Sequence, residues 1–139
     1  MKFKTTNPRP ATMTFETNDC ALRAFSTAYF LPYSVVHAMF AKAGRKPGKG
    51  VTLTQIQRVM EMIRKEFQIT STMSKRRFDE PTFAQFAKGE GKRGYWVVCA
   101  HNHAVALRNG VYMDAHPSTC GARRRVHYTI CIAPTIKPS

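Results

Sequence analysis

His103-Ala-Val-Ala-Leu-Arg-Asn109-Gly110-Val-Tyr-Met-Asp114 has the pattern of a tight β-hairpin. Asn-Gly is the preferred pair for a two-residue type I′ turn, because both central positions need a positive φ. A turn closed at this pair joins Arg108 to Val111, and counting back along both strands places His103 opposite His116. The sequence therefore predicts two antiparallel strands that meet at this turn.

The same hairpin brings an imidazole and a carboxylate to one face of the sheet. Side chains on one face repeat every two residues. The residues expected to share this face are His103, Val105, Leu107, Tyr112, Asp114 and His116. His103 and Asp114 are then diagonal neighbours, roughly 7–8 Å apart by backbone and within reach through their side chains. A slip of one residue would separate them, so the spacing suits a carboxylate that orients a histidine ring.

A cysteine stands at a predicted helix start, in Asn18-Asp19-Cys20-Ala21-Leu22-Arg23-Ala24. Asn18 and Asp19 are both good N-caps, and the backbone amides of a helix N-terminus stabilise a thiolate. A thiol, an imidazole and a carboxylate are the groups that nucleophilic acyl transfer requires. The alternatives are a buried core cysteine, a structural sheet histidine and a strand-end carboxylate, and His101 competes with His103.

Along the chain, helical signals come first and strand signals second. Residues 1–17 predict an extended arm, since Asn7-Pro8 and Arg9-Pro10 disfavour a helix. Helices are expected from Asn18 or Asp19 to Pro32, from Ser34 to Gly44, after Thr52 as far as Phe67, and at Pro81. Strands are expected at 95–99, 103–107, 111–114 and 126–132.

Helices followed by strands are typical of the α+β class. At 139 residues the chain is expected to form one domain, with N-terminal helices packed on a C-terminal antiparallel sheet. Residues 1–17 are then the arm and 18–139 the domain, helical over 18–90 and sheet-forming over 94–133. Cys20 would lie on a helix packed against the sheet that carries His103.

Charge is the unusual property, because 22 Lys and Arg against 8 Asp and Glu give a formal net charge of +14. Such a surface attracts acidic protein or nucleic acid. The basic residues expected to bind an anion or a partner are Arg45, Lys46, Lys49, Arg123, Arg124 and Arg125. The N-terminus lacks a continuous apolar segment and no stretch approaches the ~20 apolar residues of a membrane span. We therefore expect a cytoplasmic protein with free thiols.

Together these pieces resemble the papain-like cysteine peptidases, particularly small members similar to bacteriocin-leader peptidases. The resembling motifs are Asn18-Asp19-Cys20, Asn102-His103-Ala-Val-Ala and Gly110-Val-Tyr-Met-Asp114-Ala-His-Pro117. The resemblance covers roughly residues 18–60 and 94–117, and small phage-encoded proteins have a similar layout that includes the 44–50 loop. It implies a papain-like fold with Cys20 as nucleophile, His103 as general base and then acid, and Asp114 as the group that orients the imidazole.

The chain departs from this family at the oxyanion donor. Papain-like enzymes usually carry a glutamine about half a dozen residues before the cysteine, whereas Met13-Thr14-Phe15 stands here. A donor of this kind supplies ~3–4 kcal/mol of transition-state stabilisation. The main chain at Cys20, with the Asn18 amide or the Thr17 hydroxyl, is the expected substitute.

Two functions are consistent with this sequence. The first is a papain-like thiol hydrolase (peptidase, isopeptidase or amidase) with a Cys20–His103–Asp114 triad, acting on an acidic protein. For a phage-encoded chain, the target would be a host protein in the host cytoplasm. The alternative is a catalytically inactive basic protein of the same fold that binds nucleic acid or a host nucleic-acid enzyme.

No cofactor or metal is expected. Cys99-x-His101-x-His103, with His116 and Cys120, has a zinc-like composition, but alternate strand residues lie too far apart to reach one ion easily. The 44–50 loop is cationic and glycine-rich but lacks the G-x-x-x-x-G-K-[ST] pattern of a phosphate loop. We expect it to connect two helices.

Overall fold

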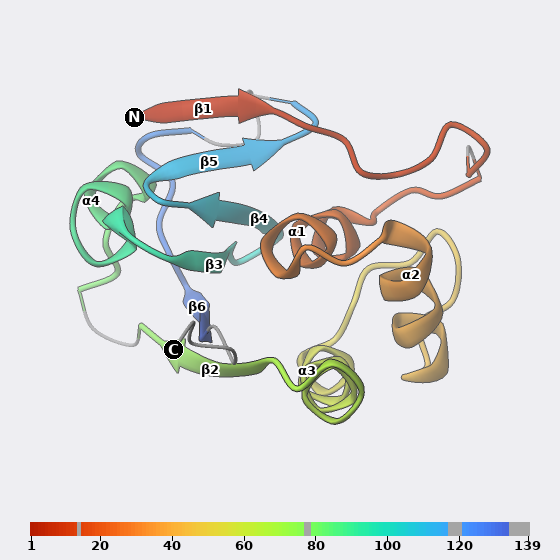
Figure 1. Cartoon of the computed structure of the whole chain (residues 1–139). Coiled ribbons are helices and arrows are strands. Elements are labelled where there is room, and N and C mark those ends of the chain that lie inside the picture. Colours follow the sequence, from red (N-terminus) through yellow and green to blue (C-terminus); the bar gives the residue numbers. More distant parts are fainter. Residues whose placement is uncertain (14, 77–78, 117–120, 134–139) are drawn as a thin grey trace.

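The fold is a mixed sheet of six strands with four α-helices, described for residues 1–13, 15–76, 79–116 and 121–133 of this computed structural model (Figure 1). The helices are α1 Cys20–Tyr29, α2 Tyr33–Lys42, α3 Leu53–Phe67 and α4 Phe83–Lys88, with a short 3-10 helix, η1, at Glu90–Lys92. The strands are β1 Lys2–Thr5, β2 Thr70–Lys75, β3 Tyr95–Ala100, β4 His103–Arg108, β5 Val111–Asp114 and β6 Tyr128–Ala133. Their order across the sheet is β1-β5-β4-β3-β6-β2, which confirms the α+β class.

The expectation of a purely antiparallel sheet is wrong, because β1 pairs with β5 in parallel. β1 comes from the 1–17 arm, and β2, which pairs antiparallel with β6, comes from the 18–90 part expected to be helical. Both are edge strands with largely exposed side chains. Neither carries the apolar alternation by which half-buried strands are recognised.

The predicted hairpin turn is confirmed. Asn109 and Gly110 have φ angles of 50° and 80°, the left-handed values that a type I′ turn requires. Arg108 pairs with Val111 across the turn. The Asn109 side-chain oxygen accepts a hydrogen bond from the backbone N–H of Gly94 at 2.9 Å, which ties the turn to the residue before β3.

The predicted alternation of side chains between the two faces of the hairpin is confirmed over its buried part. The members of the predicted face that lie in one buried cluster are Val105, Leu107 and Tyr112. The described pairing of β4 with β5 ends at Ala106 and Met113, short of the expected His103–His116 pair. His103 and Asp114 therefore lie beyond the paired region, where β4 begins and β5 ends.

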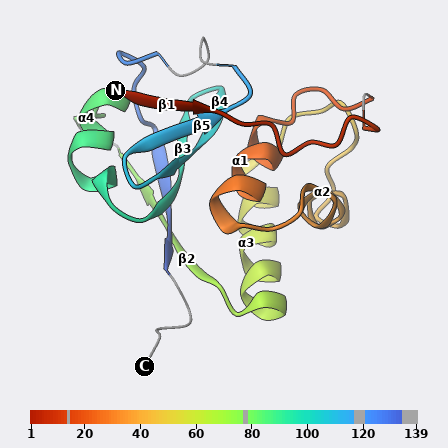
Figure 2. The same cartoon turned by 45° about the horizontal axis from the view of Figure 1, so that its top comes forward.

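Helices cover both faces of the sheet, with α1, α2 and α3 on one side and α4 on the other (Figures 1 and 2). The core under α1 includes Leu22, Phe25, Val97, Ala106 and Ile130. The core under α4 includes Phe83, Phe86, Trp96, Val98 and Leu107. β3 and the centre of β4 are buried on both faces, and their residues there are continuously apolar.

Capping signals define where α3 and α4 begin. Thr52 and Thr82 each accept a hydrogen bond at 3.1 Å from the backbone N–H three residues later. The side chains of Gln55 and Gln85 accept from the cap N–H in return, which completes two capping boxes. The helix expected at Pro81 therefore begins two residues later, at Phe83, and Pro81 precedes its cap.

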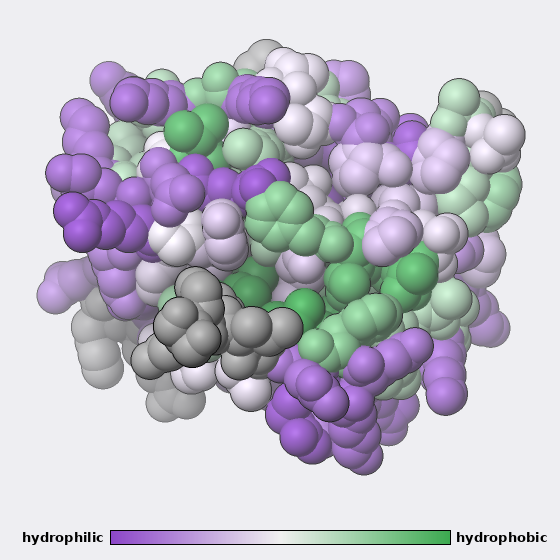
Figure 3. All heavy atoms as spheres, in the orientation of Figure 1, coloured by the Kyte–Doolittle hydropathy of each residue, from purple (hydrophilic) through white to green (hydrophobic). Residues whose placement is uncertain are grey.

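The surface is divided between polar and apolar areas. Figure 3 shows hydrophilic residues over β1 and the outer end of α3, and hydrophobic residues reaching the surface between α1, α2 and α3.

Phe30 is 57% exposed, and the Arg108 guanidinium stacks 3.6 Å from the centre of its ring, a favourable cation–π contact. Among the described helices, none is long and apolar enough to cross a membrane.

Gly91→Ala tests the packing of η1 on the sheet. A methyl group at this position would lie 2.5 Å from Leu107 Cδ2 and 2.7 Å from a ring carbon of Phe86. We expect a loss of about 1–3 kcal/mol in the free energy of unfolding, because buried neighbours must shift. Gly121→Ala is the control, since its methyl group meets nothing within 4 Å. Equal stability of the two variants in urea would contradict this packing.

Candidate active site

Three elements bring the predicted residues Cys20, His103 and Asp114 to one end of the sheet. Cys20 is the first residue of α1, His103 is the first of β4, and Asp114 is the last of β5. α1 packs directly on β4, Cys20 and His103 line the same cavity, and the interaction with His103 is one of those that lower the pKa of Cys20. The structure therefore joins the three groups, while their catalytic roles stay predictions.

The His103 ring is held from behind by a carboxylate. Its Nε2 lies 2.8 Å from Asp114 Oδ2, and the two side chains are only 10% and 4% exposed. This is the diagonal contact that the hairpin spacing predicts.

Cys20 carries the acidic thiol of this site. Burial alone would raise the pKa of Cys20. Interactions with His103 and the backbone N–H of Ala104, together with the charges of His103 and Arg23, outweigh burial and lower this pKa below its ordinary value. Burial raises the pKa of Cys99 to about 12 and also raises that of Cys131. Among these three free thiols of the described chain, Cys20 therefore ionises most readily.

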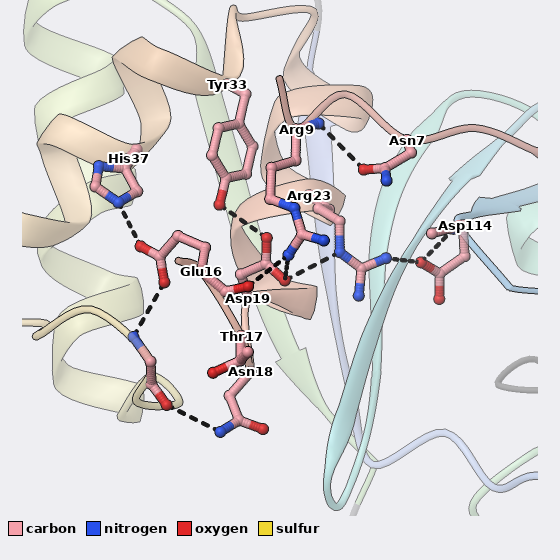
Figure 4. A network of polar contacts seen from close by, with 12 residues as sticks. Asn7, Arg9, Glu16, Thr17, Asn18, Asp19, Arg23, Tyr33, His37 and Asp114 are labelled. Atoms are coloured by element: carbon pink, nitrogen blue, oxygen red, sulfur yellow. Dashed lines mark hydrogen bonds and ion pairs between the residues drawn. The ribbon is translucent and has the colours of Figure 1, made fainter. Parts of the chain in front are cut away.

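Asp114 joins four parts of the molecule. Besides His103 on Oδ2, its Oδ1 accepts hydrogen bonds from Arg23 Nη1 (Figure 4) and, at 2.7 Å, from the backbone N–H of Ala115. Its carbonyl oxygen accepts a hydrogen bond from the N–H of Thr6 at 2.8 Å, next to the β1–β5 ladder. The predicted N-terminal arm therefore fixes the backbone of this residue.

Asp19 occupies the N-cap position of α1, which confirms the predicted helix start, but its side chain makes no capping hydrogen bond. Its Oδ2 accepts a hydrogen bond from the Tyr33 hydroxyl at 2.8 Å. Its Oδ1 lies 3.2 Å from Arg9 Nη1 and 3.3 Å from Arg23 Nε (Figure 4). These cations compensate a buried carboxylate, and the first N–H groups of α1 are left without a side-chain cap beside Cys20.

A buried ion pair fixes the 44–50 loop against the segment before Cys20. Arg45 Nη1 and Nη2 each lie 2.9 Å from a carboxylate oxygen of Glu16. Glu16 also accepts from the N–H of Gly48 at 3.0 Å and contacts His37 (Figure 4). Chiefly through Arg45, these contacts lower the pKa of Glu16 to about 2. Arg45 is only 5% exposed, so our expectation that it binds an external anion or partner is wrong.

A cavity of about 260 Å³ lies beside Cys20. Its lining includes Asn18, Cys20, His101, Asn102, His103 and Tyr128. This volume is below the usual range of small-molecule pockets, so it suits a single side chain or a narrow piece of an extended chain.

The two expected oxyanion donors lie in different places. Asn18 lines the cavity, has a φ of 54°, and donates from Nδ2 to the carbonyl of Gly48 at 2.9 Å. An amide nitrogen carries two hydrogens, so a second N–H remains on Asn18. Thr17 is exposed and does not line the cavity; its carbonyl accepts a hydrogen bond from Arg45 at 3.2 Å.

The other predicted basic residues lie at the surface. Lys46, Lys49, Arg123 and Arg125 are exposed, and Arg124 is half-buried. Arg124 donates a hydrogen bond to Asn102, and Arg125 donates one to the carbonyl of Glu80 at 2.9 Å. No described contact links these residues to the Cys20 sulfur.

The residues weighed for zinc do not converge on one point. His103 is bonded to Asp114, whereas the His101 ring stacks on His127 with centroids 4.0 Å apart. Cys99 is buried, and Cys120 lies outside the described residues.

Sequence reasoning missed Arg23 and Glu16. Arg23 follows Asp19 at a spacing of four, the distance at which helical residues of opposite charge pair, so a local signal existed for it. Its second partner, Asp114, is 91 positions away. Glu16 pairs with Arg45 across 29 positions, and no local pattern indicates that contact.

Alkylation tests the lowered pKa of Cys20. At mildly acidic pH, iodoacetamide should label Cys20 faster than Cys131, because only the thiolate reacts and the two pKa values shift in opposite directions. His103→Ala should slow labelling of Cys20 and leave Cys131 unchanged, as read by mass spectrometry of the alkylated peptides. Equal labelling rates at the two cysteines would contradict an activated thiol.

The Glu16–Arg45 pair predicts a loss of stability in acid. Glu16 has a pKa lowered from 4.5 to about 2, so its contribution is present above pH 4.5 and disappears as the pH falls towards 2. The shift corresponds to about 3 kcal/mol. Urea unfolding against pH should show this component in the wild type and not in Glu16→Gln, which is less stable at neutral pH. Glu61→Gln, in an exposed pair with Arg64, should change stability little.

Comparison with known proteins adds no relative. No protein-family model, curated protein or solved structure matches the chain. The papain-like resemblance therefore stays a prediction from motifs, and a function has to be inferred from the geometry of the Cys20 site.

Proposed function

We propose that this protein is a papain-like thiol hydrolase that cleaves amide bonds in acidic polypeptides. The observation that carries the proposal is the set Cys20–His103–Asp114, in which a thiol of lowered pKa shares a cavity with an imidazole held by a buried carboxylate. Titratable groups with shifted pKa values beside a cavity are typical of catalytic sites.

In the proposed reaction, His103 takes the thiol proton of Cys20 and the sulfur attacks the carbonyl carbon of the substrate. The resulting tetrahedral oxyanion collapses as His103 gives the proton to the nitrogen of the scissile bond, and the amine leaves. Water, deprotonated by His103, then attacks the thioester. The carboxylic acid leaves, and His103 returns the proton to the Cys20 thiolate. Asp114 keeps the ring oriented and compensates its positive charge.

The oxyanion would form beside the start of α1. The backbone N–H of Cys20 and the remaining N–H of Asn18 are its proposed donors, since Asn18 lines the cavity. The amino end of a helix also favours negative charge. This arrangement takes the place of the glutamine that the family usually carries.

Charge supports an acidic substrate. The chain has a net charge of +14, and the exposed Lys46 and Lys49 lie on the loop that ends at the cavity-lining Gly50. Such a surface speeds encounter with anionic chains. The proposed setting is the cytoplasm, or the host cytoplasm with a host protein as target for a phage-encoded chain.

p-Nitrophenyl acetate tests the chemistry without a known substrate. Wild-type protein should carry an acetyl group on Cys20 by mass spectrometry and release p-nitrophenol with turnover. His103→Ala should slow the reaction roughly 10²–10⁴-fold. Asp114→Asn should keep more activity than Asp114→Ala, because an amide oxygen still accepts from Nε2. If Cys20 stays unacetylated, or His103→Ala reacts like the wild type, the proposal is wrong.

A library of peptides rich in Asp and Glu tests the substrate class. Cleavage should occur with wild type and be absent with Cys20→Ala. Lys46→Glu combined with Lys49→Glu should lower kcat/KM for acidic peptides roughly tenfold at low salt without changing turnover of p-nitrophenyl acetate. Preference for neutral peptides would contradict the acidic substrate and leave the thiol chemistry standing.

A second candidate function is binding without chemistry, to nucleic acid or a nucleic-acid enzyme. The net charge of +14 and the exposed Arg123 favour it. Each phosphate neutralised on duplex DNA adds about 0.9 to the slope of log affinity against log salt. This function would be supported if DNA binding depends steeply on salt, the Cys20→Ala variant binds DNA like the wild type, and Cys20 is unreactive.

A further inference from the structure

Three side chains outside the Cys20–His103–Asp114 set converge from distant parts of the chain. Glu80 precedes α4, His101 lies in the turn between β3 and β4, and His127 precedes β6. One donor atom from each lies within 4.8 Å of the other two. Glu80 Oε2 is 3.3 Å from His127 Nδ1 and 3.4 Å from His101 Nε2.

We propose that Glu80, His101 and His127 bind a divalent transition-metal ion of the Zn²⁺ class. Two imidazoles and one carboxylate are a donor set that zinc and neighbouring metals use, with a further position left for water. Ligands about 2.0–2.2 Å from a tetrahedral ion are roughly 3.4 Å apart. The two distances to Glu80 match this separation, and the donor nitrogens of His101 and His127 lie within 4.8 Å of each other.

The backbone holds the ligands in place. The N–H of His127 donates to the carbonyl of Cys99 at 2.7 Å, and the carbonyl of His127 accepts from the N–H of Arg76 at 2.9 Å. Next to Glu80, the carbonyl of Pro81 accepts a hydrogen bond from the N–H of Val126 at 2.8 Å. Anchored ligands are characteristic of protein metal sites, because the entropy of arranging them is lost on folding.

Arg125 does not occupy the carboxylate of Glu80. Arg125 donates to the main-chain carbonyl of Glu80, whereas the described contacts of the Glu80 carboxylate are with the two histidines. The side chains of His101, His127 and Glu80 are 66%, 42% and 28% exposed. An ion can therefore reach the cluster from solvent and keep water as a further ligand.

The cluster adjoins the Cys20 cavity through one residue. His101 lines that cavity and stands two positions before His103. A bound ion would therefore tie the β3–β4 turn to the segments before α4 and before β6. This inference does not depend on hydrolysis at Cys20, because none of the three ligands belongs to the proposed triad.

Calorimetric titration with ZnCl₂ tests the site in the full-length Cys20→Ala protein, in which the reactive thiol cannot bind metal. We expect one equivalent of Zn²⁺ to bind. His127→Ala and Glu80→Gln on this background should each weaken Zn²⁺ binding by at least roughly 10–100-fold. Removing a residue that only supports a metal ligand already costs this much affinity, and these two residues are proposed as ligands themselves. The Co²⁺ complex should lack a sulfur-to-cobalt charge-transfer band, since no thiolate is a ligand.

His116→Ala on the same background is the matched control, because His116 is exposed and outside the cluster; it should bind Zn²⁺ like the parent. Far-ultraviolet circular dichroism checks folding. If His127→Ala does not fold, His101→Ala decides, since its side chain is largely exposed. The inference is wrong if the parent binds no Zn²⁺ at micromolar concentration, or if His101→Ala binds Zn²⁺ as tightly as the parent.

Discussion

The Asp114 carboxylate is the contact on which the geometry of the site depends. One oxygen faces His103, and the other accepts hydrogen bonds from Arg23 and from the backbone N–H of Ala115. A carboxylate this deeply buried is tolerated only when such partners compensate its lost hydration. The same contacts set the position of α1 relative to β4 and β5, so the requirement to satisfy one charge also aligns Cys20 with His103.

Buried charges around Cys20 alternate in sign. Arg9 contacts Asp19, Asp19 contacts Arg23, and Arg23 contacts Asp114. Each carboxylate in this series has a cation on at least one side, which reduces the cost of burial. Arg23 also places positive charge near the sulfur, and this charge lowers the pKa of Cys20. A series of ion pairs that stabilises the fold therefore also favours the thiolate.

How much could be predicted depends on the range of the interactions. The hairpin was predictable because Asn109-Gly110 sets the turn and the period of two then sets the His103–Asp114 contact. The start of α1 was predictable to within a residue, but the role of Asp19 was not, because its partners Arg9 and Tyr33 are distant in sequence. β1 and β2 were missed for a related reason, since an edge strand with polar side chains is defined by its neighbour in the sheet and carries little local signal.

The N-terminal arm belongs to the site although it is far from His103 in sequence. Thr6 donates to the carbonyl of Asp114, and Arg9 donates to the carbonyl of Glu16 at 2.8 Å and to Asp19. Burial opposes ionisation of Cys20, and the interaction with His103, whose ring contacts Asp114, opposes this effect of burial. Loosening the arm would remove the hydrogen bond to the Asp114 carbonyl and the Arg9 contact with Asp19 together. The arm therefore contacts both residues whose carboxylates pair with Arg23, the cation whose charge lowers the pKa of Cys20.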